Sequence, residues 1–405
     1  MTNFHWHRRS QDSIAQHCLT NSKRPESHIM GVYPTHVGKG LGCHLWDTDG
    51  KKYLDFICGL GTNFLGYANE RVNVAIADQM RFGASHSFST PVEVECAEKV
   101  KELFPFVDCV KFLKTGGEAT SAAVRIARAA TERTLVLSDG YHGWHDGFCA
   151  LTPPAIGVPD LIRSYNHEPA VMKLGEHPIG PDVAAVIIEP VITDHSRERI
   201  EYLKDLRAQC TKHGVMLIFD EVITGFRFKN YSVAQAFGIL PDLICLGKAM
   251  ANGMPLAAVG GKYAVMNCAE YFVSSTYAGE TLSLAAATRT MTLLQRQYSV
   301  EDLWLRGQHF LDQFNAMWPE QIRIEGYPTR GAFKGDPMIK ALFFQEACIA
   351  GMLFGPSWFF NFPMAAEYQN AMGTIKEIID RIRRGEVTMK GEMPKPAFAE
   401  KVRQK

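Results

Sequence analysis

The central part of the chain alternates short apolar runs with stretches of helical periodicity. Parallel strands need a crossover between them, which is usually a helix. The alternation therefore predicts an α/β fold whose mostly parallel sheet is covered by helices on both faces. The expected strands are residues 110–113, 134–138, 184–188, 215–219, 243–246 and 257–259, and the expected helices among them are 118–131, 199–213 and 233–238.

The two ends of the chain follow other patterns. Residues 41–58 alternate around Asp49 and Gly50, a dipeptide typical of a hairpin turn. We expect an N-terminal segment, 1–49, that joins the small domain, a large domain over 50–287, and a small C-terminal α+β domain over 288–405. Further helices are expected at 10–19, 69–81, 91–103, 282–298 and 365–384.

Composition narrows the classes of partner. The 405 residues carry 43 Lys+Arg and 43 Asp+Glu, so no basic field exists to attract nucleic acid. No stretch approaches the roughly 20 apolar residues of a membrane span, and the N-terminus lacks the apolar core of a signal peptide. The ten cysteines contain no Cys-x-x-Cys spacing. We expect a cytoplasmic protein with small-molecule ligands.

Two glycines, Gly116 and Gly117, lie between an expected strand and the helix that follows. Glycine lets backbone approach an anion closely, and a helix N-terminus directs its N–H groups at it. Taken alone, the segment is more often a plain turn capped by Thr115. It matches neither G-x-G-x-x-G nor a Walker loop.

An aromatic residue, Tyr141, follows the strand 134–138 and could lie flat on a planar ligand ring. A loop aromatic that only packs against the protein is the competing interpretation. His142 and His145 are three residues apart, but no third ligand lies nearby and Gly143 interrupts any helix. We therefore expect no metal site.

Two charged residues follow neighbouring apolar strands. Asp220 ends the run 215–219, and a buried carboxylate is costly unless it meets a cation. A Walker-B acid would need a Walker-A lysine, which the chain lacks; a protonated pyridine nitrogen meets the same need. Lys248 follows 243–246 and suits Schiff-base chemistry, although a lone lysine there is usually a surface residue. The order of all four segments favours pyridoxal phosphate (PLP).

Several longer motifs occur in the same order. Together they resemble the class III branch of the fold-type I PLP aminotransferases, particularly glutamate-1-semialdehyde 2,1-aminomutase and its relatives. The motifs are LWDTDGKKYLDF (45–56), TGGEATSAAVRIARA (115–129), YHGWHD (141–146), IIEPV (187–191), DEVITGFRF (220–228), LGKAMANGMPLAAVGGK (246–262) and STYAGETLSLAAA (275–287).

The resemblance implies a role for each matching residue and an obligate homodimer with active sites at the interface. Lys248 forms the Schiff base and then acts as the general base. The implied cofactor-binding roles are phosphate contacts for Gly116 and Gly117, stacking for Tyr141, packing on the other ring face for Val222, the ring-nitrogen contact for Asp220, support for Glu189, and a contact of Thr276 with the neighbouring subunit's phosphate.

Departures from the resemblance bear on the substrate. The aminomutases carry an N-terminal arginine for the substrate carboxylate, but residues 31–37 contain none, and 351–361 hold aromatics instead of a charged clamp. We expect an aminotransferase that uses an amino-acid donor, commonly glutamate, and a keto or aldehyde sugar or sugar acid as the carbonyl acceptor. An aminomutase-type isomerase and a non-catalytic scaffold are the alternatives.

Overall fold

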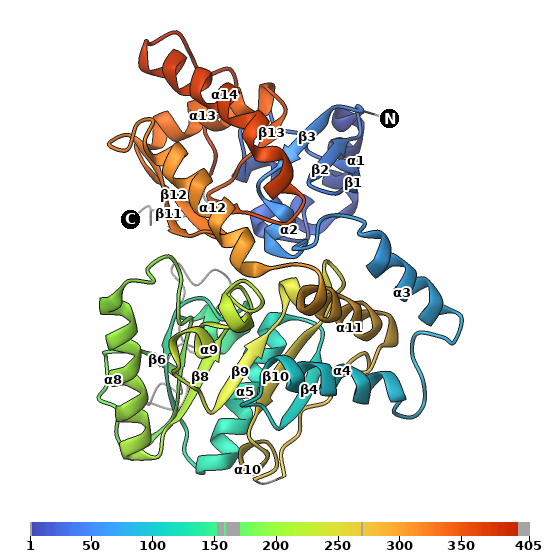
Figure 1. The fold of residues 1–405 in the computed structure, drawn as a ribbon, viewed down its shortest axis with the longest axis vertical. Helices are drawn as coiled ribbons and strands as arrows, with labels where there is room; N and C mark the ends of the chain where they lie inside the picture. Colours follow the sequence, from blue (N-terminus) through green and yellow to red (C-terminus); the bar gives the residue numbers. More distant parts are fainter. Residues whose placement is uncertain (1, 152–157, 159–170, 269, 396–405) are drawn as a thin grey trace. The chain divides into compact units, whose positions relative to one another are not determined.

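The computed structural model describes residues 2–151, 158, 171–268 and 270–395 (Figure 1). The chain divides into two compact units: unit 1 is Met1–Asn69 with Glu301–Lys405, and unit 2 is Glu70–Val300. These boundaries differ from the expected 49/50 and 287/288. Residues 50–69 group with the C-terminal part because the strand that contains Leu54 pairs with the one that contains Met352.

Unit 2 is built on a seven-stranded sheet in the order β4-β10-β9-β8-β7-β5-β6. All strands are parallel except β10, which runs antiparallel to both of its neighbours. The mostly parallel sheet of an α/β fold is thus confirmed. The strands are β4 (Cys109–Leu113), β5 (Leu135–Asp139), β6 (Val171–Lys173), β7 (Val183–Ile188), β8 (Met216–Asp220), β9 (Leu243–Leu246) and β10 (Ala257–Gly261).

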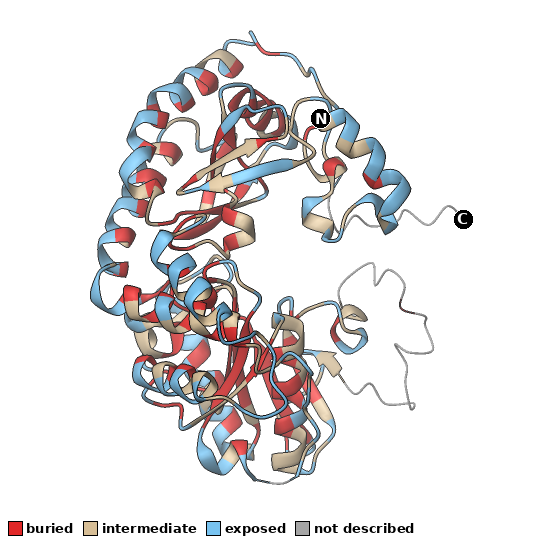
Figure 2. Ribbon diagram, turned by 90° about the vertical axis from the view of Figure 1, so that its right-hand side faces the viewer, coloured by how far each residue is buried: buried red, intermediate tan, exposed pale blue. Residues whose placement is uncertain are grey.

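Helices flank this sheet. Figure 1 shows α8 on one side of the strands and α4 and α11 on the other, and α5 packs against β7 to β10. The central strands are almost wholly buried (Figure 2). The six helices expected here agree within two residues at each end. The helical elements are α3 (Glu70–Met80), α4 (Pro91–Leu103), α5 (Gly116–Thr131), α6 (Asp146–Cys149), α8 (Arg197–His213), η5 (Lys229–Tyr231), α9 (Val233–Phe237), η6 (Lys248–Ala251), α10 (Tyr263–Met266) and α11 (Thr281–Arg296).

Unit 1 contains two smaller sheets, β1-β2-β3-β13 and β11-β12-β14. The expected hairpin forms between β2 and β3, with Gly50 at a φ of 89°. No described helix is long and apolar enough to cross a membrane. The elements are β1 (Val37–Leu41), β2 (His44–Asp47), β3 (Lys52–Asp55), α2 (Cys58–Gly61), α12 (Val300–Asn315), β11 (Ile322–Tyr327), β12 (Arg330–Gly335), α13 (Pro337–Ile349), β13 (Met352–Leu353), β14 (Ser357–Phe359) and α14 (Met364–Arg383).

The N-terminal helix begins earlier than expected. Helix α1 spans Asn3–Ser13 instead of 10–19. Thr2 caps it, because the His5 N–H donates to the Thr2 hydroxyl at 3.3 Å. Gln16 and His17 have φ values of 57° and 62°, which are incompatible with a continuing right-handed helix.

The aromatic residues of 351–361 form core, not a substrate-stacking surface. Phe354 is fully buried and stacks on Phe56 with 4.3 Å between ring centroids. Trp358 is equally buried and stacks on Phe310 at 5.1 Å. Residues 351–361 thus hold aromatics and no charged residue, and these aromatics stabilise unit 1 by burying apolar area.

Candidate active site

Strand register brings the expected site residues to one edge of the sheet in unit 2. Asp139 of β5 lies opposite Ile188 of β7, and Asp220 of β8 lies opposite Cys245 of β9. The ends of β5, β7, β8 and β9 therefore coincide, and the loops after them leave the sheet together. In sheets of this kind, ligands bind beyond the carboxyl ends of the strands. We call this region the sheet edge.

Asp220 is held at the sheet edge by two hydrogen bonds. Its Oδ1 accepts from the Val222 N–H at 3.1 Å, and its Oδ2 lies 2.8 Å from His142 Nδ1. The two side chains are buried, at 6% and 1% exposure. Burial by itself lowers the pKa of His142, but the hydrogen bond and charge of Asp220, with the charge of Glu189, outweigh it and raise the pKa. Asp220 is thereby fixed in orientation and remains an acceptor.

The glycines at the start of α5 provide close backbone approach. A Cβ on Gly116 would lie 2.9 Å from Val222 Cγ1, and a Cβ on Gly143 would lie 2.7 Å from Gly117 Cα. Thr115 caps the helix as well, since its hydroxyl accepts from the Glu118 N–H at 3.3 Å. Gly116 and Gly117 occupy the first helical positions, where N–H groups have no partner within the helix. The Gly116 segment is therefore a turn capped by Thr115, and it is also a helix N-terminus whose N–H groups suit an anion.

Glu189 positions the backbone that carries Tyr141. Its Oε1 accepts from the Tyr141 N–H at 2.9 Å, and a Cβ on Gly140 would lie 2.9 Å from the same oxygen. Arg199 holds the backbone of the Glu189 segment, because its Nη2 donates to the Glu189 carbonyl at 3.0 Å. Tyr141 keeps 47% of its surface exposed. A partly open aromatic ring at a strand end is suited to lie against a planar ligand.

Lys248 is the first residue of η6, which follows β9 after Gly247, and its φ is 41°. A left-handed backbone is uncommon for a residue with a Cβ, and such positions cluster at functional sites. Gly247 packs closely behind it, because a Cβ there would lie 3.3 Å from Val222 Cγ1. Val222 therefore lies between the Gly116 turn and the lysine loop. Neighbouring strands are about 4.8 Å apart, and Asp220 lies opposite Cys245, so Lys248 follows in the loop just beyond this pair.

Thr276 lies exposed in a turn that precedes α11. The described residues of unit 2 show no hydrogen bond or ion pair between Thr276 and the other site residues. The turn is connected to the segment before Gly116 by an ion pair of 2.9 Å between Lys114 Nζ and Glu280 Oε2. The expected contact of Thr276 with a neighbouring subunit stays a prediction.

Sequence reasoning did not identify the partner of Asp220. His142 was considered only as a metal ligand, yet its ring binds Asp220, and its carbonyl accepts from the Thr120 hydroxyl at 2.6 Å. The neighbouring His145 shares a 2.7 Å hydrogen bond with Ser121. The sequence did contain an indication of this contact: His142 directly follows Tyr141, at the sheet edge where the buried Asp220 also lies.

These groups fit pyridoxal phosphate. A Cβ on Gly116 would clash with Val222, the buried acid Asp220 keeps acceptor capacity, and Lys248 follows the adjacent strand. Val222 packs against Gly116 and Gly247 and so places an apolar side chain next to these groups. Together, the fold and this site define a PLP-dependent enzyme of fold type I.

Comparison with known proteins identifies the family. The model of the family Aminotransferase class-III matches residues 27–356. The glutamate-1-semialdehyde 2,1-aminomutase of Syntrophobacter fumaroxidans is 32% identical over 88% of this chain and 92% of its own length. That of Desulfitobacterium hafniense is 36% identical over 79% and 80%. The chain belongs to the class III aminotransferase family, and its cofactor is PLP.

Solved structures agree on the fold. The FumI protein of a Sphingopyxis species, in its PLP internal aldimine form, has a TM-score of 0.85 at 22% identity and covers 97% of this chain and 98% of its own. The ornithine aminotransferase of Toxoplasma gondii has a TM-score of 0.80 at 21% identity and covers 95% and 96%.

Proposed function

We propose that the chain is an aminotransferase that moves an amino group from an amino-acid donor, commonly glutamate, to a carbonyl acceptor. The observation that carries the proposal is the position of Lys248 and Asp220 at the ends of the adjacent parallel strands β9 and β8. When bound, PLP supplies an electron sink for the donor's α-carbon.

Each residue of the sheet edge would have a separate role in this reaction. Lys248 Nζ would hold the cofactor covalently, and its free amine would serve as the base for the proton on the donor's α-carbon. Asp220 would pair with the protonated ring nitrogen, and His142 fixes the orientation of the Asp220 carboxylate. The Gly116 and Gly117 amides would bind the phosphate oxygens.

The cofactor ring would lie between two side chains from different strand ends. In this proposal Tyr141 covers one face and Val222 the other, and Glu189 supports the Tyr141 backbone. The buried position of Val222 against Gly116 and Gly247 supports its role as a rigid apolar floor. Such packing orients the ring relative to Lys248.

The working molecule in this proposal is a cytoplasmic homodimer with sites at its interface. Thr276 would reach the phosphate bound by the neighbouring subunit, and its exposed turn supports this assignment. All ten cysteines lie within the described ranges, and none of them forms a disulfide, as expected in a reducing compartment.

The proposed acceptor is a keto or aldehyde sugar or sugar acid, with an amino sugar as product. The support is the absence of an arginine in 31–37, where the aminomutases carry one for the substrate carboxylate. Residues 351–361 likewise hold buried aromatics and no charged residue, so they provide no charged clamp for a substrate carboxylate.

A glutamate-1-semialdehyde 2,1-aminomutase is the second candidate, because the curated relatives carry that name. The two activities differ in mass balance. An aminotransferase releases a keto acid from the donor, whereas an aminomutase isomerises its substrate without an external donor.

The test measures keto-acid release from glutamate in the presence of keto and aldehyde sugars, with the visible absorption of the bound cofactor as a second readout. We expect one keto acid per aminated product. Lys248→Ala should lower the rate by at least roughly 10³-fold and remove the lysine-bound cofactor band. Lys262→Ala is the matched control, since Lys262 is an exposed residue after β10 that pairs with Asp108, and should retain the wild-type rate.

Stoichiometric isomerisation of glutamate-1-semialdehyde without any donor would replace the proposal with the aminomutase. A chain that binds no PLP and has no visible band would instead be a non-catalytic scaffold.

A further inference from the structure

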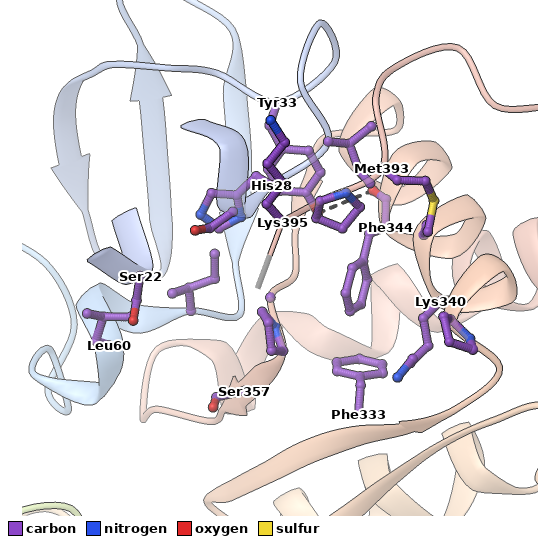
Figure 3. Close-up of a pocket in the computed structure, with 18 residues that line it drawn as sticks. Ser22, His28, Tyr33, Leu60, Phe333, Lys340, Phe344, Ser357, Met393 and Lys395 are labelled. Carbon is purple, nitrogen blue, oxygen red and sulfur yellow. Dashed lines mark hydrogen bonds between the residues drawn. The ribbon is translucent and has the colours of Figure 1, made fainter. Parts of the chain in front are cut away.

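Unit 1 contains a cavity whose lining residues have no role assigned at the sheet edge. Its volume is about 560 Å³, within the range of small-molecule sites. Figure 3 draws the 18 residues that line it. They come from four parts of unit 1: residues 22–33, 57–60, 333–357 and 393–395. We call it the unit 1 cavity.

At this cavity, backbone hydrogen bonds join the C-terminal segment to the N-terminal segment. The Glu392 N–H donates to the Met30 carbonyl at 3.1 Å, and the Lys395 N–H donates to the Glu26 carbonyl at 2.6 Å. The Gln345 side chain of α13 accepts from the Lys390 N–H at 2.6 Å. Segments from both parts of unit 1 are therefore joined by backbone hydrogen bonds, so the cavity is a built feature of the unit.

The walls are mainly apolar and aromatic. Figure 3 shows Tyr33 and His28 on one side of the space and Phe333 and Phe344 on the other. The Tyr33 hydroxyl donates to the Phe344 and Phe354 carbonyls at 3.3 and 2.9 Å, so its ring remains to face a ligand. His28 stacks on Tyr33 with 5.2 Å between centroids, and burial lowers its pKa and favours the neutral ring.

The charged groups at the cavity have one sign. Lys340 and Lys395 line it, and none of the described lining residues is acidic. Lys340 forms no ion pair with any residue in the described ranges, although it lies in the first turn of α13. The carboxylate of Asp336, the N-cap of α13, already accepts the Met338 and Ile339 N–H groups at 2.8 and 2.9 Å. An anionic group would complement this wall.

Backbone strain also borders the cavity. Cys58 and Leu60 have φ values of 51° and 60°, and Leu60 lines the space. The Asp55 carboxylate maintains this turn, since it accepts the Ile57 and Cys58 N–H groups at 2.9 and 3.0 Å. Left-handed conformations of residues with a Cβ cost of order 1 kcal/mol or more, and are typical of ligand-binding segments.

We propose that the unit 1 cavity binds a small carboxylate with an aromatic or similarly apolar body. The carboxylate pairs with the Lys340 ammonium, and the body packs among Tyr33, Phe333 and Phe344. The ligand class follows from the apolar walls together with Lys340, which has no acidic partner among the described residues; inorganic phosphate would leave the walls uncovered. None of the residues that line this cavity belongs to the sheet edge.

The test is calorimetric titration of the full-length PLP-loaded protein with 3-phenylpropionate, and with 3-phenylpropanamide as the neutral analogue. We expect saturable binding of the acid and about 10-fold weaker binding of the amide, which corresponds to 1.4 kcal/mol. Lys340→Met should weaken the acid about 10-fold and leave the amide unchanged. Lys334→Met, an exposed lysine on β12 outside the lining, is the matched control and should bind as the wild type does.

Phe344→Leu should weaken both probes, since it reduces the shared apolar contact. Retained amide binding by Lys340→Met proves that its cavity is intact. The proposal is overturned if the acid shows no saturable binding in the millimolar range, if acid and amide bind equally, or if Lys340→Met matches the wild type. Repeating the titration with Lys248→Ala separates this outcome from failure of the proposed activity, because the acid should bind that variant normally.

Discussion

The sheet edge of unit 2 and the unit 1 cavity are built by the chain in different ways. At the sheet edge, each side chain follows its own strand, and the register of parallel strands brings the ends together. The cavity instead gathers segments from four separate stretches, fastened by contacts such as Lys395 to Glu26. A change at the sheet edge should therefore alter chemistry with little loss of stability, whereas a change in the cavity walls should alter packing.

Two adjacent acids test whether this contrast holds within the sheet edge itself. Asp220 keeps acceptor capacity beyond its bonds to Val222 and His142. Glu221 is fully buried and its oxygens are satisfied by its own chain: by the Val233 and Ala234 N–H groups at 2.8 and 2.9 Å, and by the Thr224 hydroxyl at 2.9 Å.

The largest expected effect comes from Asp220→Asn. The amide keeps the size of the side chain but removes the charge that favours a protonated ring nitrogen. We expect the turnover rate to fall roughly 10²-fold. At alkaline pH, where the pair with His142 contributes least, the free energy of unfolding of the cofactor-free protein should fall by less than about 1 kcal/mol. Steady-state kinetics and urea unfolding of the same preparations measure both quantities. Wild-type turnover in this variant would remove Asp220 from the catalytic site.

Glu221→Gln is the matched substitution and should have the opposite profile. Turnover should stay within about three-fold, while the free energy of unfolding at pH 5 falls by about 1–3 kcal/mol, because the amide nitrogen faces buried N–H donors. Burial raises the pKa of Glu221 to about 7, despite the opposing hydrogen bonds from Ala234 and Val233. Equal losses of turnover in the two variants would contradict the division between them.

The raised pKa gives the Glu221 effect a pH dependence. Since the folded protein holds this proton more tightly than the unfolded chain, the wild type loses stability as pH rises from about 4.5 through about 7. Glutamine does not titrate. The destabilisation caused by Glu221→Gln should thus be larger at pH 5 than at pH 8, which urea unfolding at the two pH values measures.

The strand-end residues could be predicted from the sequence because strand, turn and helix signals are local. The runs that precede Asp220 and Lys248 are apolar over their whole length, and parallel strands align their ends by geometry. The contact of His142 with Asp220 joins residues 78 positions apart, across two strand ends. Periodicity contains no information about such a side-chain pair, so only the structure identifies it.

The unit boundary and the cavity could not be predicted from the sequence either, because both depend on contacts between segments that are far apart in the chain. Residues 50–69 belong with unit 1 because Leu54 pairs with Met352, a parallel contact between distant segments. The sequence shows that 351–361 hold aromatics in place of a charged clamp, but not what these rings pack against. Their burial against Phe56 and Phe310 decides for core, and it depends on tertiary packing that no local pattern contains.

A smaller effect is expected from His142→Gln. The variant loses the charged hydrogen bond to Asp220, so turnover should fall about 10-fold through misorientation of that carboxylate. Although burial alone would lower it, contacts with Asp220 raise the pKa of His142. The stabilisation from the protonated ring is therefore fully present below about pH 6.5 and is lost as pH rises through the higher folded pKa.

Urea unfolding across this range checks the prediction: the stability difference between wild type and His142→Gln should be greatest near pH 6 and shrink toward alkaline pH. His177→Gln is the control, because His177 pairs with Asp182 at the surface, at 3.2 Å. A pH-independent difference for His142→Gln would show that the histidine acts by shape alone.

The smallest expected effect tests the cavity side of the comparison. Tyr33→Phe keeps the ring that faces the unit 1 cavity but removes the hydroxyl that donates to the Phe344 and Phe354 carbonyls. The two carbonyls lose the one O–H proton that they share, so the free energy of unfolding should fall by about 1–2 kcal/mol. Tyr263→Phe, at an exposed ring, should change it by less than about 0.5 kcal/mol. Equal stabilities of the two variants would mean that the wall does not depend on this hydroxyl, and that the cavity, like the sheet edge, tolerates the loss of single groups.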